Sequence, residues 1–499
     1  MPTLDCASIN RQKTGVAVRH YRCPTVATLL LLVAGAASIP SPAQTIAVSS
    51  PANNSQVLSP VHYAASATSP NCLQGISGMR IYIASHVVAY KVQASSIDTQ
   101  LTLTPGTYKT VVQAWDRCGN LSKRAVNITV APSGLKPARF VYVADRFAKL
   151  WGFNANPSNG VLSQTAQGPV FVNDQIKALA ADKGGYRLYG AFGDTTPPPR
   201  GGIYAYFIDR RNGHLNPVPG SPFSTAPRGC GAIAVHPSGK FVFVGTISTD
   251  FSQGILVFAV NADGSLTQVN ETPIPIGSGV TSLAPDRWGR YLYVATASSI
   301  EAYAIDQSSG ALTAIPGSPY PIPTGSPDGP LVDLYGRFLY TSLAVPQFTP
   351  EAIRGFAIAG KTGTLTELPG SPFPFDPEST AQSLAVEPSG RFLYVSTEGQ
   401  GSGIAIYSIN AGNGALTLLK SLFHPDIPCV VSRECGMRNL TADPSGKFLY
   451  FLTNSNSNGV RTGSVGAFAI DPVTGDVSLA FQPIALATPS EVRDMVITP

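Results

Sequence analysis

Short runs of alternating apolar and polar residues dominate the chain. Val, Ile, Tyr, Phe and Thr fill these runs, and Gly, Pro, Asn and Asp interrupt them. Few stretches carry apolar residues at helical spacing. Alternation with period two, bounded by turn residues, is typical of strands that bury one face. The pattern therefore predicts an all-β protein with many turns.

From residue 139 onward one strand pattern recurs seven times, 47 to 56 residues apart. A fixed period of this length indicates a repeat architecture. A second and a third strand follow each copy, and a Pro-Ser-Gly turn precedes several, with Gly suited to the positive φ of a tight turn. We expect the repeated Tyr and Phe side chains to be core residues between neighbouring repeats. The copies are RFVYVA (139–144), YRLYGA (186–191), KFVFVG (240–245), RYLYVA (290–295), RFLYTS (337–342), RFLYVS (391–396) and KFLYFL (447–452).

A fourth strand of small residues precedes six of these seven copies, from IKALAAD (176–182) to RNLTADP (438–444). The first copy has no such strand before it, whereas VRDMVITP (492–499) ends the chain without an aromatic strand after it. The last strand is therefore predicted to pair with residues 139–144. This pairing would close a seven-bladed β-propeller over residues 139–499 and leave no exposed sheet edge.

The first 43 residues differ from the rest of the chain. A basic start is followed by the apolar run VATLLLLVAGAAS (26–38) and the small residues SPA (41–43). This pattern predicts a secretory signal peptide over residues 1–43, with a retained N-terminal anchor as the alternative. The apolar run is short for a membrane span, and no later segment could span one. The sequence thus predicts a secreted or periplasmic protein with no membrane span after cleavage.

Removal of this leader would leave 30 basic and 28 acidic residues, a net charge of +2. Such a balance does not indicate nucleic acid or an anionic membrane as partner. Export permits disulfides, and five of the seven cysteines follow the leader. Cys72 and Cys118 are expected to pair, Cys429 and Cys435 could pair locally, and Cys230 would remain, although spacing alone does not fix the connectivity.

Residues 45–132 alternate in the same way but lack the repeat. About ninety residues of this kind suit a small immunoglobulin-like β-sandwich, and the segment resembles the bacterial immunoglobulin-like modules appended to exported proteins. Trp115 is expected to be a core aromatic of this sandwich. Residues 133–138 are predicted to form a short linker. The sandwich would provide adhesion or spacing through a surface or matrix partner.

Strand order places the loops that enter each inner strand, and those that follow each aromatic strand, on one face of the propeller. Ligands of propellers usually lie at this face, where all blades converge. His236 and His214 are predicted on the opposite face as structural residues, and the chain contains none of the common hydrolase, metalloprotease or phosphate-loop motifs. No cofactor or metal is therefore expected. The polar candidates at the ligand face are Asp145, Arg146, Asp174, Lys177, Arg228, Cys230, Asp250, Asp328, Glu351, Arg354, Glu398, His424, Arg433, Glu434, Arg438, Asn454, Arg493 and Asp494.

The repeat SLAVEPSGRFLYVST (383–397) with GIAIYSINAGNGALT (403–417) resembles the seven-bladed lactonase propeller family, which includes the propeller-type 6-phosphogluconolactonases and carboxy-muconate lactonising enzymes. The resemblance covers residues 139–499. It implies an Arg eight residues before a turn glycine and a Glu eight residues after it, where Arg anchors an anion and Glu or His transfers a proton. In this chain Arg438 precedes Gly446, but Asn454 follows it. Glu398 follows the turn glycine of the preceding repeat, so no blade carries both residues.

The resemblance implies a metal-independent lactonase acting on a small anionic or sugar-like lactone at the channel mouth. The alternative is a non-catalytic binding or scaffold propeller. The predicted catalytic residues are Glu398 and His424, and the predicted substrate-binding residues are Arg438, Arg228, Asn454 and Arg493.

Overall fold

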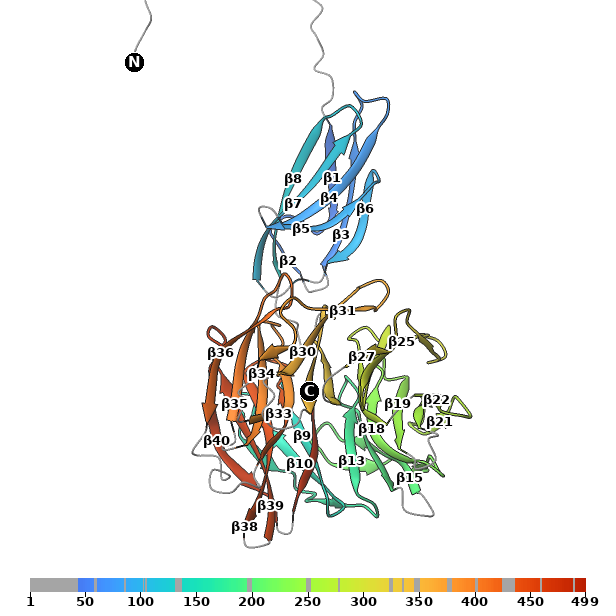
Figure 1. The fold of residues 1–499 in the computed structure, drawn as a ribbon, viewed down its shortest axis with the longest axis vertical. Helices are drawn as coiled ribbons and strands as arrows, with labels where there is room; N and C mark the ends of the chain where they lie inside the picture. Colours follow the sequence, from blue (N-terminus) through green and yellow to red (C-terminus); the bar gives the residue numbers. More distant parts are fainter. Residues whose placement is uncertain are drawn as a thin grey trace, which may run out of the picture. The chain divides into compact units, whose positions relative to one another are not determined.

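The computed structural model contains only β-strands as regular elements among the residues it describes (Figure 1). The prediction of an all-β protein is confirmed for this part of the chain. In the described segments no helix is long and apolar enough to cross a membrane. The described residues are 44–499 apart from 58–60, 85–86, 102, 104–105, 131–136, 195–199, 248–252, 277–278, 323–325, 334–335, 345–350, 375–378, 400–402, 424–435, 458–459 and 488–489. The predicted leader and most of the predicted linker lie outside them.

Two packed sheets form the N-terminal part of the described chain. Their strand orders are β1-β3-β6 and β2-β8-β7-β4-β5, and only β2 and β8 run parallel. Inward side chains of both sheets, including Tyr63, Met79 and Val112, share one buried cluster. The strands are β1 (Thr45–Ser50), β2 (Ser55–Val57), β3 (Val61–Thr68), β4 (Ile76–Ala84), β5 (Val87–Val92), β6 (Ser96–Leu101), β7 (Gly106–Asp116) and β8 (Leu121–Val130).

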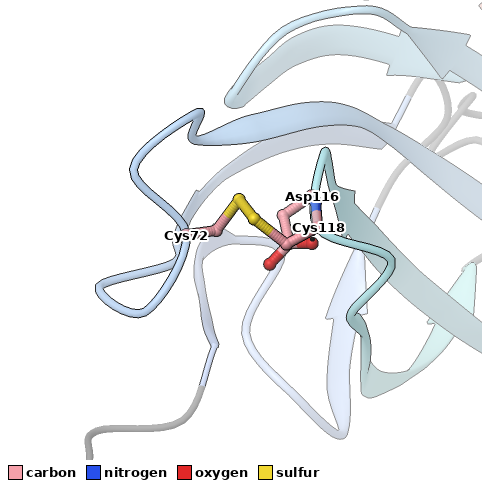
Figure 2. A group of neighbouring side chains, drawn as sticks. All are labelled: Cys72, Asp116 and Cys118. Carbon is pink, nitrogen blue, oxygen red and sulfur yellow. Dashed lines mark hydrogen bonds between the residues drawn. A yellow bond between two sulfur atoms is a disulfide. The ribbon is translucent and has the colours of Figure 1, made fainter.

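A disulfide joins the loop before β4 to the loop after β7 (Figure 2). It links Cys72 and Cys118, which are 46 residues apart in sequence. Asp116 lies beside it and accepts hydrogen bonds from Ser69 Oγ (2.6 Å) and from the amides of Cys118 (2.9 Å) and Asn120 (2.8 Å). These bonds lower the pKa of Asp116 to about 2, so the carboxylate stays charged and holds the loop together.

The prediction that Trp115 is a core aromatic is wrong. Successive residues of a strand point to opposite faces, and Val112 and Ala114 point into the shared core, so Trp115 lies on the outer face of its sheet. Its indole covers Gly78, where an added Cβ would come within 2.5 Å of the ring. Trp115 is half-buried in this position.

Seven further sheets follow, each built from four antiparallel strands, and five of them carry a short fifth strand. We call each sheet a blade. Blade 1 contains β9 (Phe140–Asp145), β10 (Lys149–Ala155), β11 (Leu162–Gln164), β12 (Val170–Phe171) and β41 (Val492–Thr498); blade 2 contains β13 (Ile176–Ala181), β14 (Arg187–Asp194), β15 (Arg200–Ile208), β16 (Leu215–Pro217) and β17 (Phe223–Ser224). Blade 3 contains β18 (Gly229–Val235), β19 (Phe241–Ile247), β20 (Gly254–Val260), β21 (Leu266–Gln268) and β22 (Ile274–Pro275); blade 4 contains β23 (Val280–Pro285), β24 (Tyr291–Thr296), β25 (Ser299–Ile305), β26 (Leu312–Ala314) and β27 (Tyr320–Pro321). Blade 5 contains β28 (Ser326–Val332), β29 (Phe338–Ala344), β30 (Glu351–Ile358), β31 (Leu365–Glu367) and β32 (Phe373–Pro374); blade 6 contains β33 (Ser379–Val386), β34 (Phe392–Gly399), β35 (Gly403–Ile409) and β36 (Leu416–Phe423); and blade 7 contains β37 (Gly436–Ala442), β38 (Phe448–Ser457), β39 (Val460–Ile470) and β40 (Val477–Ala485).

The C-terminal strand belongs to the first blade. β41 pairs antiparallel with β9, from Val492 opposite Asp145 to Thr498 opposite Phe140. The inner strand of each blade also contacts the inner strand of the next, in the order β13, β18, β23, β28, β33, β37 and β41, and β41 contacts β13. Blade 1 is therefore assembled from the two ends of the repeat region.

The repeated aromatic residues are buried between blades, as predicted. Tyr142, Tyr293 and Tyr340 are fully buried in the second strands of their blades. The hydroxyl of each donates a hydrogen bond of 2.7–2.9 Å to a glycine carbonyl in the following blade. A buried hydroxyl needs such a partner, so these bonds fix one blade against the next.

The turn glycines that follow six of the seven inner strands adopt the predicted conformation, with φ between 60° and 76°. Gly239 and Gly390 have φ values of 72° and 68°, in the left-handed region that glycine tolerates. In blade 6 the buried Glu387 carboxylate accepts hydrogen bonds from the amides of Ser389 and Arg391 in this turn. The recurring Pro-Ser-Gly sequence is thus a structural turn at the end of the inner strand.

Candidate functional site

A cavity of about 620 Å³ lies where the seven inner strands converge. Three consecutive residues from each of six inner strands line it, together with Gly329 from β28. The six segments are 177–179, 231–233, 281–283, 382–384, 439–441 and 493–495. The segments occupy the central part of their strands, and those of β13, β23 and β41 begin at the second residue of the strand. A cavity of this volume can hold a small molecule such as a sugar lactone.

Each inner strand carries a β-bulge at this level. A bulge inserts one extra residue into a strand and re-aims a side chain, and bulges are enriched beside active sites. In β37, for example, Arg438 and Thr441 pair with residues that are only two apart in β38, which leaves Asn439 and Leu440 in the bulge. The residues that line the cavity at the bulges are Lys177, Gly231, Thr281, Gly329, Gln382, Asn439 and Arg493.

The bulge residues that form this ring differ in charge and polarity from one sector of the cavity to the next. Lys177 and Arg493 lie on the contacting strands β13 and β41 and bring two positive charges to one sector. Small side chains line the sector from β18 to β28, and the two amides, Gln382 and Asn439, line the sector from β33 to β37. Two cations side by side favour an anionic group of a ligand in their sector.

Asp494 follows Arg493 and is the only carboxyl group among the described lining residues. Its Oδ2 accepts a hydrogen bond from the amide of Leu179 (2.6 Å), and its Oδ1 accepts one from the amide of Met495 (2.8 Å). The Nδ2 group of Asn439 also donates to Oδ1. Asp494 therefore connects β41 to both neighbouring inner strands, β13 and β37.

Burial raises the pKa of Asp494 to about 6, although its three hydrogen bonds oppose the shift. Asp494 is half-buried as a residue and lines the cavity. A carboxylate offers about four acceptor positions, and the three donors leave one position for a ligand or water. A carboxyl with this pKa and an open acceptor can exchange a proton near neutral pH.

Asn439 is held in an unusual conformation. Its φ of +50° lies in the left-handed region, which non-glycine residues adopt infrequently. The Oγ1 of Thr441 donates a hydrogen bond to its side-chain oxygen (3.3 Å), so its amide nitrogen is directed to Asp494. The amide of Leu440 donates to Ser383 Oγ (3.0 Å) and anchors the bulge to β33. This backbone positions the donor that orients the carboxyl.

Of the six residues predicted for the site, Arg493 lines the cavity. Arg228 lies in the turn before β18, where its backbone amide and carbonyl bond Thr225 (3.1 and 2.8 Å), and it is not among the described lining residues. Asn454 bonds the backbone of Val492 through both side-chain atoms (3.0 and 2.8 Å) and so joins β38 to β41.

Glu398 and Arg438 lie on strands of adjacent blades. Glu398 is opposite Thr380 near the end of β34, and Arg438 is opposite Leu452 at the start of the bulge in β37. Their side chains are outside the described part of the structure, as are the whole residues His424, Cys429 and Cys435. Their roles remain predictions.

Several other candidates of the ligand face have structural roles. Asp145 is fully buried and accepts a hydrogen bond from the indole of Trp151 (3.0 Å), and Asp174 accepts one from Tyr204 (2.9 Å). Cys230 is a buried free thiol, and burial raises its pKa to about 11, which makes it a poor nucleophile at neutral pH. Arg146 and Arg354 pair with Glu491 and Glu367. The side chains of Asp328 and Glu351 and the whole residues Asp250, Arg433 and Glu434 lie outside the described part of the structure.

One spacing in the sequence identifies most of the ring. The residue eight positions before the turn glycine is the bulge residue Lys177, Gly231, Thr281 or Gln382 in blades 2, 3, 4 and 6. In blade 7 the same count gives Arg438, whereas the bulge places the next residue, Asn439, at the cavity. The residue type at this position differs from blade to blade, so no repeated residue marks the ring in the sequence.

The only cluster of three metal-ligating side chains within the described residues is Cys72, Asp116 and Cys118 (Figure 2). Its two sulfur atoms are bonded to each other, and metal ligation requires free thiolates. The residues of this cluster therefore fit a covalent crosslink and not a metal ion.

Comparison with known proteins gives one family and several relatives. Residues 215–325 and 337–493, more than half of the chain, match the family described as "Lactonase, 7-bladed beta-propeller". A 6-phosphogluconolactonase of Serratia proteamaculans is 24% identical over 308 residues, which are 52% of this chain and 86% of the relative.

Solved structures agree with this match. A putative 6-phosphogluconolactonase from Bacteroides fragilis has a TM-score of 0.52 at 17% identity, over 74% of this chain and all of the relative (100%). The periplasmic gluconolactonase of Pseudomonas aeruginosa has a TM-score of 0.53 at 19% identity, over 72% of this chain and 99% of the relative. At these identities the structural likeness establishes the propeller fold alone.

Proposed function

Because the chain belongs to the lactonase family of seven-bladed β-propellers, we propose that it hydrolyses a small lactone or sugar-acid lactone in the central cavity. The observation that carries this proposal is the cavity lining. Two cations, Lys177 and Arg493, line the same cavity of about 620 Å³ as the single described carboxyl, Asp494. An anion anchor beside a proton-transfer group is the arrangement that ring opening of such a substrate requires.

The roles follow from the chemistry of the reaction. The two cations hold a carboxylate, phosphate or hydroxyl group of the substrate and orient its carbonyl. Asp494 takes a proton from water as the water oxygen bonds to the carbonyl carbon. The ring carbon–oxygen bond then breaks, and the same proton passes to the leaving oxygen. Because its pKa is about 6, Asp494 is mostly ionised at neutral pH and can act first as base and then as acid.

The residues predicted at the channel mouth keep their proposed roles beside this group. Glu398 and His424 are proposed as further acid–base residues, and Arg438, Arg228 and Asn454 as substrate-binding residues. The backbone positions of Glu398 and Arg438 on adjacent blades support this, since both lie in the part of their strands nearest the bulges. Arg438→Ala and Glu398→Gln would lower turnover if they act in the reaction.

We also propose export and the finer architecture. The N-terminal leader supports a secreted or periplasmic location, in which the Cys72–Cys118 bond would form and persist. The two packed sheets support an immunoglobulin-like module, and the pairing of β41 with β9 supports a propeller closed by its last strand. A propeller closed in this way has no open sheet edge.

A panel of five- and six-membered sugar-acid lactones tests the proposal with the purified chain from residue 44 onward. Asp494→Asn is expected to lower kcat by about a hundredfold or more. Lys177→Gln and Arg493→Gln are expected to raise KM by about tenfold through loss of a charge-assisted hydrogen bond. Lys361→Gln removes an exposed charge elsewhere and is the matched control.

The second candidate function is a non-catalytic binding propeller, which the separation of Arg438 and Glu398 into two blades favours. Calorimetric titration with the corresponding open-chain sugar acids separates the two functions. Binding that depends on Lys177 and Arg493, without turnover of any lactone, would establish the binding function and refute the hydrolase.

A further inference from the structure

The outer face of the sheet β2-β8-β7-β4-β5 carries a row of positive charges. Residue pairs across the strands place Lys123 opposite Gln113, Gln113 opposite Arg80, and Arg80 opposite Lys91. Paired residues of neighbouring strands point to the same side of a sheet. The row therefore crosses four strands, β8, β7, β4 and β5, and spans about 14 Å at the usual strand spacing.

Two aromatic rings flank this row. The Arg80 guanidinium lies 4.8 Å from the ring centre of Tyr82 and 5.5 Å from that of Trp115, and the Lys91 ammonium lies 5.8 Å from that of Trp115. These distances are within the range of cation–π attraction. The rings therefore hold both cations against the sheet in the absence of a ligand. Because the side chains are already ordered, binding through them costs less conformational entropy.

The positively charged groups of this row have hydrogen-bond donors that are available to a ligand. Within the described residues no carboxylate pairs with Arg80, Lys91 or Lys123. The Nε of Arg80 donates to Gln113 Oε1 (2.9 Å), and its terminal nitrogens are not among the buried unsatisfied atoms. A guanidinium has five N–H donors, so most of them remain for a ligand. Trp115 and Tyr82 are half-buried, and Lys91 and Lys123 are exposed.

From this geometry we infer that the face binds an acidic polysaccharide, a polymer of sugars that carry carboxylates. The carboxylates of such a polymer match the bidentate geometry of Arg, and the rings of Trp115 and Tyr82 hold the cations in place for them. The row of cations would follow successive charged sugars. This binding site is separate from the proposed lactonase cavity and does not depend on it.

Two other anionic macromolecules fit less well. Nucleic acid binding depends on an extensive positive field, and the chain after residue 43 has a net charge of only +2. A membrane-binding surface presents a continuous patch of protruding apolar side chains. On this face the exposed Leu121 and Val88, opposite Trp115 and Tyr82, lie on β8 and β5 with two strands between them, and the indole of Trp115 lies against the sheet over Gly78. The extended row of ordered cations favours the glycan, whose carboxylates repeat along the polymer.

Affinity electrophoresis and calorimetry with a polyuronate, at low salt and with the chain from residue 44 onward, test the inference. The wild type is expected to be retarded by the polyuronate but not by a neutral dextran, and binding should change the fluorescence of Trp115. Lys91→Gln with Lys123→Gln is expected to weaken binding about tenfold, because two exposed charge pairs are lost. These exposed side chains can be replaced without affecting the core.

Lys361→Gln, which removes one charge elsewhere in the chain, is the matched control and should bind as the wild type does. Trp115→Phe keeps an aromatic ring and should retain binding without the fluorescence change. The inference is overturned if the polyuronate does not bind, if dextran binds equally, or if the double variant binds like the control. It is also overturned if anionic lipid vesicles or DNA bind more tightly than the polyuronate through the same lysines.

Discussion

Asp494 makes the stability of the propeller depend on pH in a direction that can be calculated. Its pKa rises from the usual 3.8 to about 6 in the folded protein, so the folded chain holds this proton more tightly than the unfolded chain. Between these two values the unfolded chain binds fewer protons, and the free energy of unfolding falls as pH rises. The shift of about two pKa units corresponds to about 3 kcal/mol in total, of which about 2 kcal/mol falls between pH 4 and pH 7.

Asp494→Asn removes this titration, so the two proteins should differ in the slope of stability against pH. The substitution also changes hydrogen bonds with Leu179, Met495 and Asn439, which shifts stability by a similar amount at every pH. The advantage of the wild type over the variant should therefore shrink by about 2 kcal/mol from pH 4 to pH 7.

Urea unfolding followed by tryptophan fluorescence measures this difference. The chain has three tryptophans, and a Trp115→Phe background leaves Trp151 and Trp288, both in the blades, as reporters of the propeller. Midpoints and slopes at four pH values give the free energies. Parallel curves for the two proteins would refute the reasoning, because they would mean that the folded environment leaves the carboxyl unperturbed.

Three further predictions follow from the described contacts. The variant Asn439→Gly accepts the φ of +50° but lacks the side-chain amide that donates to the Asp494 carboxylate. Loss of this hydrogen bond should raise the pKa of Asp494 and move the acidic limb of the pH–rate profile to higher pH. An unchanged limb would contradict the assigned hydrogen bond. Replacing Cys72 and Cys118 by Ser opens a 46-residue loop and should destabilise the sandwich by about 4 kcal/mol in chemical unfolding; reduction of the wild type should reproduce the loss. Tyr340→Phe leaves a buried carbonyl of the next blade without its donor and should cost about 1 kcal/mol in propeller unfolding; no loss would show that water replaces the hydroxyl.

The repeat made the blades predictable from sequence. Each copy has its own alternating pattern and turn glycine, so strands such as β34 could be placed within a few residues. The position of Trp115 was not predictable in the same way. It stands in a strand whose neighbouring residues are all apolar or buried, and only the pairing with Gly78 shows which face the indole covers.

The cavity was less accessible to sequence reasoning than the blades. Alternation assigns one face to each residue, but a bulge shifts every later side chain by one position. The direction of the Asn439 side chain therefore depends on a bulge that the residue types of the strand do not predict. The sequence places Asp494 at the ligand face, but its raised pKa arises from burial among strands that are far apart in sequence.

The seven bulges separate the chemistry of the cavity from the stability of the scaffold. The same backbone irregularity presents a lysine, an arginine, two amides, a threonine and two glycines to the common space, and the pairing of the surrounding sheets is maintained in each case. Evolution could therefore exchange these side chains independently and alter substrate preference without redesigning the fold. Independent exchange of these residues would explain how one propeller architecture can bind many different small ligands. It also makes these seven positions suitable targets for engineering a new substrate specificity.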